Sequence, residues 1–161
     1  MSDTESQSQP ISGERSHNTP TILSVLATMT EDQKKKRLIQ WAEIKHFTPE
    51  EFDSSDLPGS GILMNLEFVK ILDQMRDKCR FPFHVNSGIR SEAVNAEVGG
   101  VDSSEHTDGN GADIRAETGG EKFALVKSAL DLGIKRIGVG KRFIHVGMSF
   151  KHPQSVVWTY S

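Results

Sequence analysis

Three side chains that commonly bind metal ions stand in the C-terminal part of this chain: His106, Asp113 and His145. Two neutral imidazoles and one carboxylate are a frequent ligand set for catalytic zinc, and they leave the fourth position to water. Gly109 and Gly111 lie between the first two ligands and argue against a helix there. We therefore expect a tight loop that runs into a strand and brings His106 and Asp113 together.

His145 lies in residues 143–146, whose pattern predicts a β-strand, and a strand would hold the third ligand rigidly. Each part of this pattern also has an ordinary interpretation. A single histidine in a strand is more often a satisfied core residue than a ligand. The segment 108–111 can be simple turn chemistry. A calcium loop is a further alternative, although the EF-hand pattern is not met. Residue types and spacing alone leave zinc as one option among several.

A resemblance to a known family narrows these options. Ser104 to Asp113 resembles the S-x-H-x-x-G-x-A-x-D signature of zinc D-alanyl-D-alanine carboxypeptidases and dipeptidases. That family includes phage L-alanyl-D-glutamate endolysins, and Hedgehog domains share its fold. Residues 86–91 resemble its S-G-x-R segment, residues 143–146 its second-histidine strand, and residues 157–160 the closing strand of phage-type members. The four segments follow the family order over residues 46–160.

The resemblance implies zinc ligation by His106, Asp113 and His145, and substrate contacts by Arg90 and Ser104. It also implies a catalytic part for Arg90, whose planar, permanently charged guanidinium would polarise the scissile carbonyl or hold a carboxylate. Without the resemblance, a surface ion pair is the simpler interpretation of Arg90. The implied activity is that of a zinc peptidase that cleaves peptidoglycan stem peptides at a D-Ala-D-Ala or an L-Ala-D-Glu bond.

The chain departs from the family pattern at positions that bear on proton transfer. Arg142 stands where many members have an acidic residue or a histidine, and Gly147 where phage-type members often have aspartate. Glu105, Asp108 and His152 are near in sequence, but none is a matched position. The general base is therefore not identified. Replacement of Gly147 by aspartate tests for a missing proton carrier, since a large rise in activity would show that this chain lacks one.

These departures also support an alternative function. The protein would then be a catalytically impaired, metal-containing binding or structural module of a virion or a cell-wall assembly. A smaller departure is Gly111, which stands where the family usually has alanine, and we expect this change to be harmless.

The elements that must position these residues follow from capping and periodicity. We expect a disordered arm at residues 1–20, a helical segment at 21–45 and a zinc peptidase-like domain at 46–161. The predicted elements of that domain are a helix start at 48–52, helices at 66–79, 91–98 and 121–132, and strands at 83–86, 112–115, 136–139, 143–146 and 156–160. Their order predicts an α+β fold, with a small antiparallel sheet and flanking helices.

Composition excludes several other classes. A net charge of −3 gives no reason to expect binding to nucleic acid. No stretch approaches the roughly 18 apolar residues of a membrane helix. Residues 1–20 have no apolar core after a basic start, so we expect no secretory signal. A phage or prophage protein that reaches the cell wall after lysis or as a virion component fits these features. The arm at 1–20 would then bind a virion or assembly partner.

Overall fold

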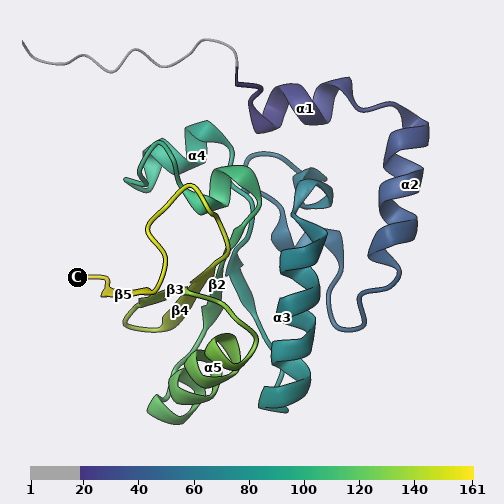
Figure 1. The fold of residues 1–161 in the computed structure, drawn as a ribbon. Helices are drawn as coiled ribbons and strands as arrows, with labels where there is room; N and C mark the ends of the chain where they lie inside the picture. The colour runs from purple at the N-terminus through teal and green to yellow at the C-terminus, as the bar shows by residue number, and fades with distance from the viewer. Residues whose placement is uncertain (1–18) are drawn as a thin grey trace, which may run out of the picture.

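A five-stranded sheet is the centre of the computed structural model, which describes residues 19–161; residues 1–18 of the expected arm lie outside it (Figure 1). The strands are β1 Val85–Ser87, β2 Gly111–Arg115, β3 Arg136–Val139, β4 Phe143–Gly147 and β5 Val156–Thr159. Their order in the sheet is β1-β2-β4-β3-β5. Every neighbouring pair is antiparallel except β3 and β5, which run parallel. The predicted α+β class is therefore confirmed, with one parallel pair added to the sheet.

Helices surround this sheet, and their starts follow the capping residues. The α-helices are α1 Ile22–Thr28, α2 Glu31–Trp41, α3 Leu66–Cys79, α4 Glu92–Glu97 and α5 Gly119–Asp131; the 3-10 helices are η1 Pro49–Phe52, η2 Ser60–Leu63 and η3 Glu105–Asp108. The side chains of Asn65, Ser91 and Thr118 each accept a backbone N–H in the first turn of α3, α4 and α5. None of the helices among residues 19–161 is long and apolar enough to cross a bilayer.

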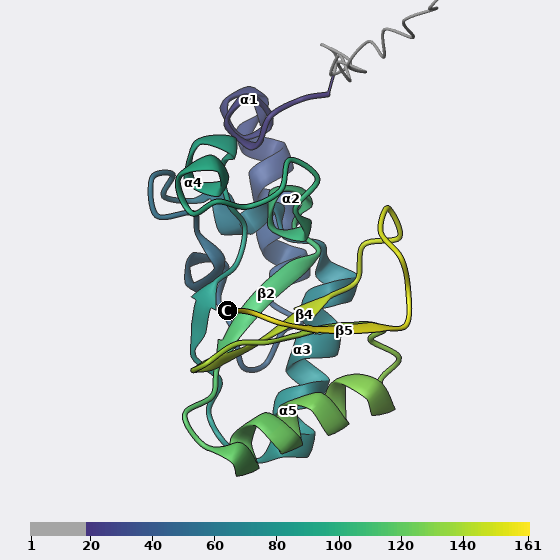
Figure 2. The same cartoon turned by 90° about the vertical axis from the view of Figure 1, so that its left-hand side faces the viewer.

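The two faces of the sheet differ because successive side chains of a strand point to opposite sides. One face buries a set of small and branched apolar side chains: Ala112, Ile114, Ile137, Ile144 and Val146. Helices α3 and α5 pack against each other and belong to the same core (Figures 1 and 2). The alternate positions of β2 and β4 place Asp113 and His145 on the opposite face.

The N-terminal helices pack onto this same core. Ile22 of α1 and Trp41 of α2 are buried, and the Trp41 ring lies 5.8 Å from that of Phe52. Arg37 of α2 donates hydrogen bonds to the carbonyl oxygens of Ile62 and Met64. Residues 22–41 are therefore bound to the domain that follows them through both apolar and polar contacts.

Several predicted boundaries differ from the observed ones by one or two residues, as in α5, which is predicted at 121–132 and observed at Gly119–Asp131. The first strand begins at Val85 rather than at Phe83, and the Phe83 ring packs against those of Phe47 and Phe81. The loop that we expect before β2 contains the 3-10 helix η3, whose first turn is capped by Ser104. That short helix carries the first of the expected metal ligands.

Candidate metal centre

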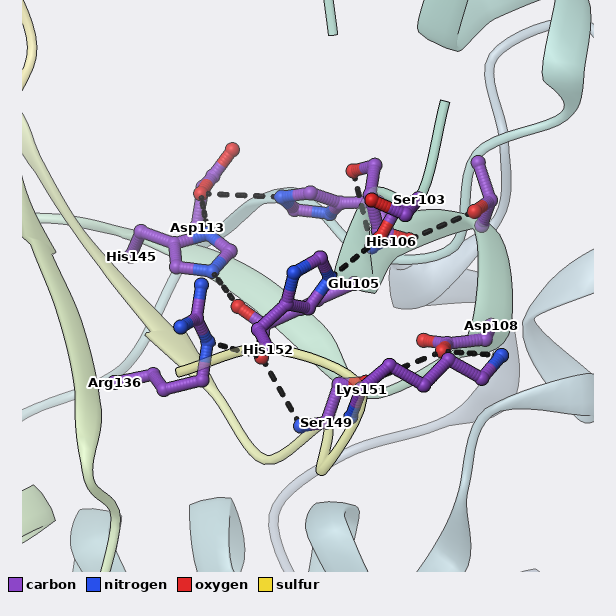
Figure 3. Close-up of polar contacts among 12 residues, drawn as sticks. Ser103, Glu105, His106, Asp108, Asp113, Arg136, His145, Ser149, Lys151 and His152 are labelled. Atoms are coloured by element: carbon purple, nitrogen blue, oxygen red, sulfur yellow. Dashed lines mark hydrogen bonds and ion pairs between the residues drawn. The ribbon is translucent and has the colours of Figure 1, made fainter. Parts of the chain in front are cut away.

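The structure brings together His106, Asp113 and His145, whose ligand atoms all lie within 4.8 Å of one another. Oδ1 of Asp113 lies 2.8 Å from Nδ1 of His145 and 3.4 Å from Nε2 of His106 (Figure 3). All three side chains are buried. Two imidazole nitrogens and one carboxylate oxygen therefore converge on one point, and this donor set fits a divalent metal ion.

Strand register and a tight loop produce this convergence. Asp113 and His145 are direct partners in the antiparallel pair β2–β4, so their side chains leave the sheet side by side. His106 comes from η3, which ends at Gly109 with φ at 70°. Glycine adopts this left-handed conformation without strain, and the chain then turns directly into β2. The expected tight loop between the first two ligands is present.

Each imidazole is also held by the nitrogen that faces away from Asp113. Nδ1 of His106 lies 2.6 Å from the carbonyl oxygen of Gly88, and Nε2 of His145 lies 3.0 Å from Oε2 of Glu105. When a metal ion is bound, these contacts would keep the N–H on the outer nitrogen of each ring and free the inner nitrogen to act as a ligand. Metal-binding histidines are oriented in this manner by a carbonyl or a carboxylate.

Gly88 is required for the first of these contacts. A Cβ atom at this position would lie 2.6 Å from Cα of Phe52, which is backbone and has no freedom to move aside. Ile89, the next residue, donates its backbone N–H to the carbonyl oxygen of Phe52. A glycine therefore lets the segment after β1 approach η1 closely enough for its carbonyl to reach His106.

Arg90, two residues after Gly88, contacts the candidate ligand Asp113. Its Nε donates to Oγ of Ser87 and its Nη2 donates to Oδ2 of Asp113, both at 2.8 Å. The ion pair is largely shielded, with the Arg90 side chain 17% exposed and that of Asp113 10% exposed. Arg90 thus pairs with a buried carboxylate and not with a surface group.

Ser104 precedes η3, and its hydroxyl accepts the backbone N–H of His106 at 3.3 Å. Ser104 and Arg90 both line the cleft over the three candidate ligands. The structure therefore places both residues beside the site, and their contacts with a substrate stay predictions.

The electrostatics of the cluster favour a bound cation. Burial raises the pKa of Asp113, but hydrogen bonds from His106 and His145 outweigh it, and the pKa lies below its ordinary value. Burial also raises the pKa of Glu105, while the hydrogen bonds from His145 and from the N–H of Ser149 lower it to a net value below the usual one. Both carboxylates are therefore ionised at neutral pH.

The pKa of His145 is shifted in the opposite direction, above its ordinary value. Burial lowers the pKa of its imidazole, but the hydrogen bonds with Asp113 and Glu105 outweigh burial and raise the pKa. The two carboxylates therefore favour a positive charge between them.

A cleft of about 590 Å³ opens over the cluster. Trp158 of β5 forms part of its wall, with its ring 5.4 Å from that of His145, and the guanidinium of Arg136 lies 5.2 Å from the centre of the Trp158 ring. Tyr160 and the exposed side chains of Val98 and Val101 also line the cleft. The cleft thus joins cationic, aromatic and aliphatic surface around the candidate metal ligands.

Of the three sequence neighbours considered as proton carriers, Asp108 lies apart from the cluster. Its carboxylate pairs with Lys151 at 3.2 Å (Figure 3). His152 lines the cleft but its Nε2 contacts the carbonyl of Ser103 at 2.6 Å. Glu105 contacts a candidate ligand directly.

Arg142 is exposed and forms a bidentate ion pair with Glu117: its Nε donates to Oε2 at 2.7 Å and its Nη2 donates to Oε1 at 2.9 Å. It is not among the residues that line the cleft. The basic residue at this position therefore does not enter the candidate site.

Glu105, Arg136 and Trp158 are parts of the site that the motifs alone do not indicate. Only Glu105 has a local signal, because it directly precedes the first histidine. Arg136 and Trp158 reach the site through strand pairing, opposite Gly147 and Gly138.

Comparison with known proteins decides the family. A family model, Peptidase M15, matches residues 45–147, which is more than half of the chain. The chain belongs to the peptidase M15 family. Among solved structures, the L-Ala D-Glu endopeptidase ChiX from Serratia marcescens is similar, with 21% identity over 55% of this chain and 83% of that chain and a TM-score of 0.43. No curated protein matches the sequence.

Membership of the M15 family confirms the resemblance that the motifs indicate. The matched residues include the three candidate ligands, Arg90 and Ser104. This M15 protein therefore combines a peptidase family match with a His-Asp-His cluster that could hold a metal ion, while β5, which supplies Trp158, lies beyond the matched residues.

Proposed function

We propose that this M15 protein is a zinc-dependent peptidase that cleaves stem peptides of bacterial peptidoglycan, at a D-Ala-D-Ala or an L-Ala-D-Glu bond. One observation carries the proposal: Nε2 of His106, Oδ1 of Asp113 and Nδ1 of His145 converge in the wall of a cleft, in a chain of a peptidase family. Neither a nucleic acid nor a membrane is part of this function.

The donor set is the reason for choosing zinc. Two imidazoles and one carboxylate match the ligand types of catalytic zinc sites, whereas calcium and magnesium prefer sites made of oxygen atoms alone. A zinc ion held by these residues would activate water and polarise the scissile carbonyl of the peptide.

Arg90 is suited to bind an oxygen atom of the substrate. Its Nε and Nη2 are occupied by Ser87 and Asp113, and among the contacts of the described residues none involves Nη1. The fixed plane of the guanidinium therefore holds Nη1 in place beside the cleft. Stem peptides carry carboxylates and backbone carbonyls, and either group is a suitable acceptor for this N–H.

Ser104 and the aromatic wall would define the rest of the binding site. We propose that the Ser104 hydroxyl contacts the substrate, since it lies beside His106 and lines the cleft. Trp158 and Tyr160 offer flat apolar surface on which the methyl groups of alanine residues can pack.

The route to the cell wall is a separate proposal that rests on the likeness to phage-type members. We propose a phage or prophage protein that is made in the cytoplasm and acts after lysis or as a virion component. Residues 1–20 would then bind a partner in the assembly. Deletion of these residues should leave zinc affinity unchanged, and a loss of zinc on deletion would contradict a separate role for the arm.

Purified muropeptides test the enzymatic proposal. Wild-type protein with zinc, wild-type protein with a chelator, and the variant His145→Ala would be compared, with products identified by mass spectrometry. Loss of the terminal D-alanine would identify a carboxypeptidase, and separation of L-alanine from the rest of the stem would identify an endopeptidase. Cleavage that persists with the chelator would contradict a metal-dependent reaction.

The second candidate function is a metal-containing module without turnover, in a virion or cell-wall assembly. It is favoured by one observation: Arg142, at the position where relatives often carry an acidic residue or a histidine, pairs with Glu117 outside the cleft. Zinc binding without cleavage of any muropeptide would support this module and reject the peptidase.

A further inference from the structure

The carboxylate of Glu105 is buried and bonded at both oxygen atoms. The residue is 4% exposed. Its Oε2 lies 3.0 Å from Nε2 of His145, and its Oε1 accepts from Nε of Arg136 and from the backbone N–H of Ser149, both at 3.0 Å (Figure 3). Three separate elements therefore fix the Glu105 side chain against the outer edge of a candidate metal ligand.

Two facing glycines make room for this carboxylate. Gly111 and Gly147 are direct partners on β2 and β4. A Cβ atom at Gly147 would lie 2.1 Å from Oε2 of Glu105, and a Cβ atom at Gly111 would lie 2.8 Å from its Cβ. The side chain of Glu105 thus occupies the volume that side chains at positions 111 and 147 would fill.

This arrangement connects two of the three departures from the family pattern, Gly111 and Gly147. The family usually has alanine where this chain has Gly111, and phage-type members often have aspartate where it has Gly147. The absence of a Cβ at Gly111 leaves space for Glu105, and the expectation that this glycine is harmless stays a prediction. An aspartate at position 147 alone would bring its Cβ against the Glu105 carboxylate, so we do not expect this single variant to show the rise in activity that would reveal a missing proton carrier.

We propose that Glu105 is the positioning residue of this metal centre and that it replaces, from η3, an acidic side chain on β4. Its carboxylate accepts the N–H of His145 at Nε2 and so fixes the ring with Nδ1 directed toward Asp113 and the metal. This inference rests on the proposed function, since it assumes that the three ligands bind zinc. Both oxygens of Glu105 are already bonded, so its role is to orient His145 and not to carry protons to the substrate.

Moving the carboxylate from position 105 to position 147 tests the proposal. The variants are Glu105→Ala, Glu105→Gln, Gly147→Asp and the double variant Glu105→Ala/Gly147→Asp. Zinc affinity would be measured by competition with a chromophoric chelator. The visible spectrum of the Co²⁺-substituted protein would report the ligand geometry, and thermal melting of the metal-free protein would report folding.

We expect Glu105→Ala to weaken zinc binding by about 10- to 100-fold and to change the Co²⁺ spectrum. Glu105→Gln keeps one acceptor oxygen, so its zinc affinity should fall less than that of Glu105→Ala. Gly147→Asp alone should weaken binding, because two carboxylates would share one volume. The double variant should regain most of the affinity that Glu105→Ala loses, since the aspartate would then have the vacated space and the same ring to bind.

Two results would overturn the proposal. One is wild-type zinc affinity and Co²⁺ spectrum in Glu105→Ala, and the other is a double variant no better than Glu105→Ala. If Glu105→Ala fails to fold, Glu105→Gln and the double variant decide by the same two measurements. Glu117→Ala is a matched control, because Glu117 is an acidic residue outside the cleft, bonded to Arg115 and Arg142.

The muropeptide assay separates this proposal from the proposed function. Cleavage by the wild type together with unchanged zinc affinity in Glu105→Ala would reject the positioning role and keep the peptidase. The expected losses of affinity without cleavage by the wild type would keep the positioning role and reject the peptidase.

Discussion

Arg90 donates a hydrogen bond to Oδ2 of Asp113 at 2.8 Å, while both candidate histidine ligands contact the other oxygen, Oδ1. Each oxygen of the Asp113 carboxylate thus has its own partners, and together these partners fix the orientation of the group. Its orientation depends on a guanidinium that bonds Ser87 and Asp113 at the same time.

Arg90→Lys should weaken zinc binding by about 10- to 100-fold, because a lysine keeps the charge but cannot bond Ser87 and Asp113 together in a fixed plane. It should also raise KM for the stem peptide if Arg90 contacts the substrate. Chelator competition and steady-state kinetics measure the two effects. Arg115→Lys, in an exposed ion pair with Glu117, is the control. Wild-type zinc affinity in Arg90→Lys would show that Arg90 does not orient Asp113.

Gly88→Ala should destabilise the protein by about 1–3 kcal/mol, because the new methyl group would press on the Phe52 backbone and force the segment away. The carbonyl of Gly88 would move with it and release His106, so zinc affinity should also fall. Urea unfolding measures the first effect. The control is Gly119→Ala at the start of α5, where a Cβ meets no atom within 4 Å. Equal stability of the two variants would contradict the close approach of the two segments.

Zinc should raise the melting temperature of the wild-type protein. Free zinc at about 100 times Kd adds about 2.7 kcal/mol to the stability of a protein that binds it only when folded. For a chain of this size, this corresponds to a rise in Tm of roughly 5–10 °C. His145→Ala should lose the rise, whereas the exposed histidine variant His84→Ala should keep it. A zinc-dependent rise retained by His145→Ala would remove His145 from the ligand set.

The Glu117–Arg142 pair makes a prediction about pH. Hydrogen bonds from Arg142 and Arg115 lower the pKa of Glu117 from 4.5 to about 2. Because the pKa is lowered in the folded state, the pair stabilises the protein fully above pH 4.5, and its contribution is lost as the pH falls towards 2. In Arg142→Gln, the pKa of Glu117 should move back towards 4.5, as measured by NMR titration of its carboxyl carbon.

The same variant should leave zinc affinity unchanged, since Arg142 lies outside the cleft. Arg142→Lys is the matched control for the pKa, because it retains a positive charge beside Glu117. Loss of zinc from Arg142→Gln would contradict the separation between this surface pair and the candidate site.

Local sequence signals predict most of the elements that carry the ligands. Asn65 and Ser91 mark the starts of α3 and α4 because capping depends on neighbouring residues alone. The alternation around Asp113 and His145 likewise predicts β2 and β4 and the face on which both ligands lie. The family resemblance then selects a metal site from among the open alternatives.

The place of Glu105 directly before His106 is a local signal, but the role of Glu105 depends on contacts that are distant in sequence. Its partners His145, Arg136 and Ser149 are 31 to 44 residues away in sequence. The space that its side chain fills exists because Gly147, on strand β4, has no side chain. Such a compensation is decided by tertiary packing, so it becomes visible only when the strands are placed side by side.

The pairing of Asp113 with His145 also ties metal binding to the correct assembly of the sheet. A slip of β4 by one residue along β2 would turn His145 towards α3 and α5 and bring an isoleucine or a valine to the cleft. With this one-residue slip, the β2–β4 pair could not supply both of its ligands to the cleft. Metal occupancy would therefore report on alignment during refolding, and the ion would favour molecules whose strands have found their native partners.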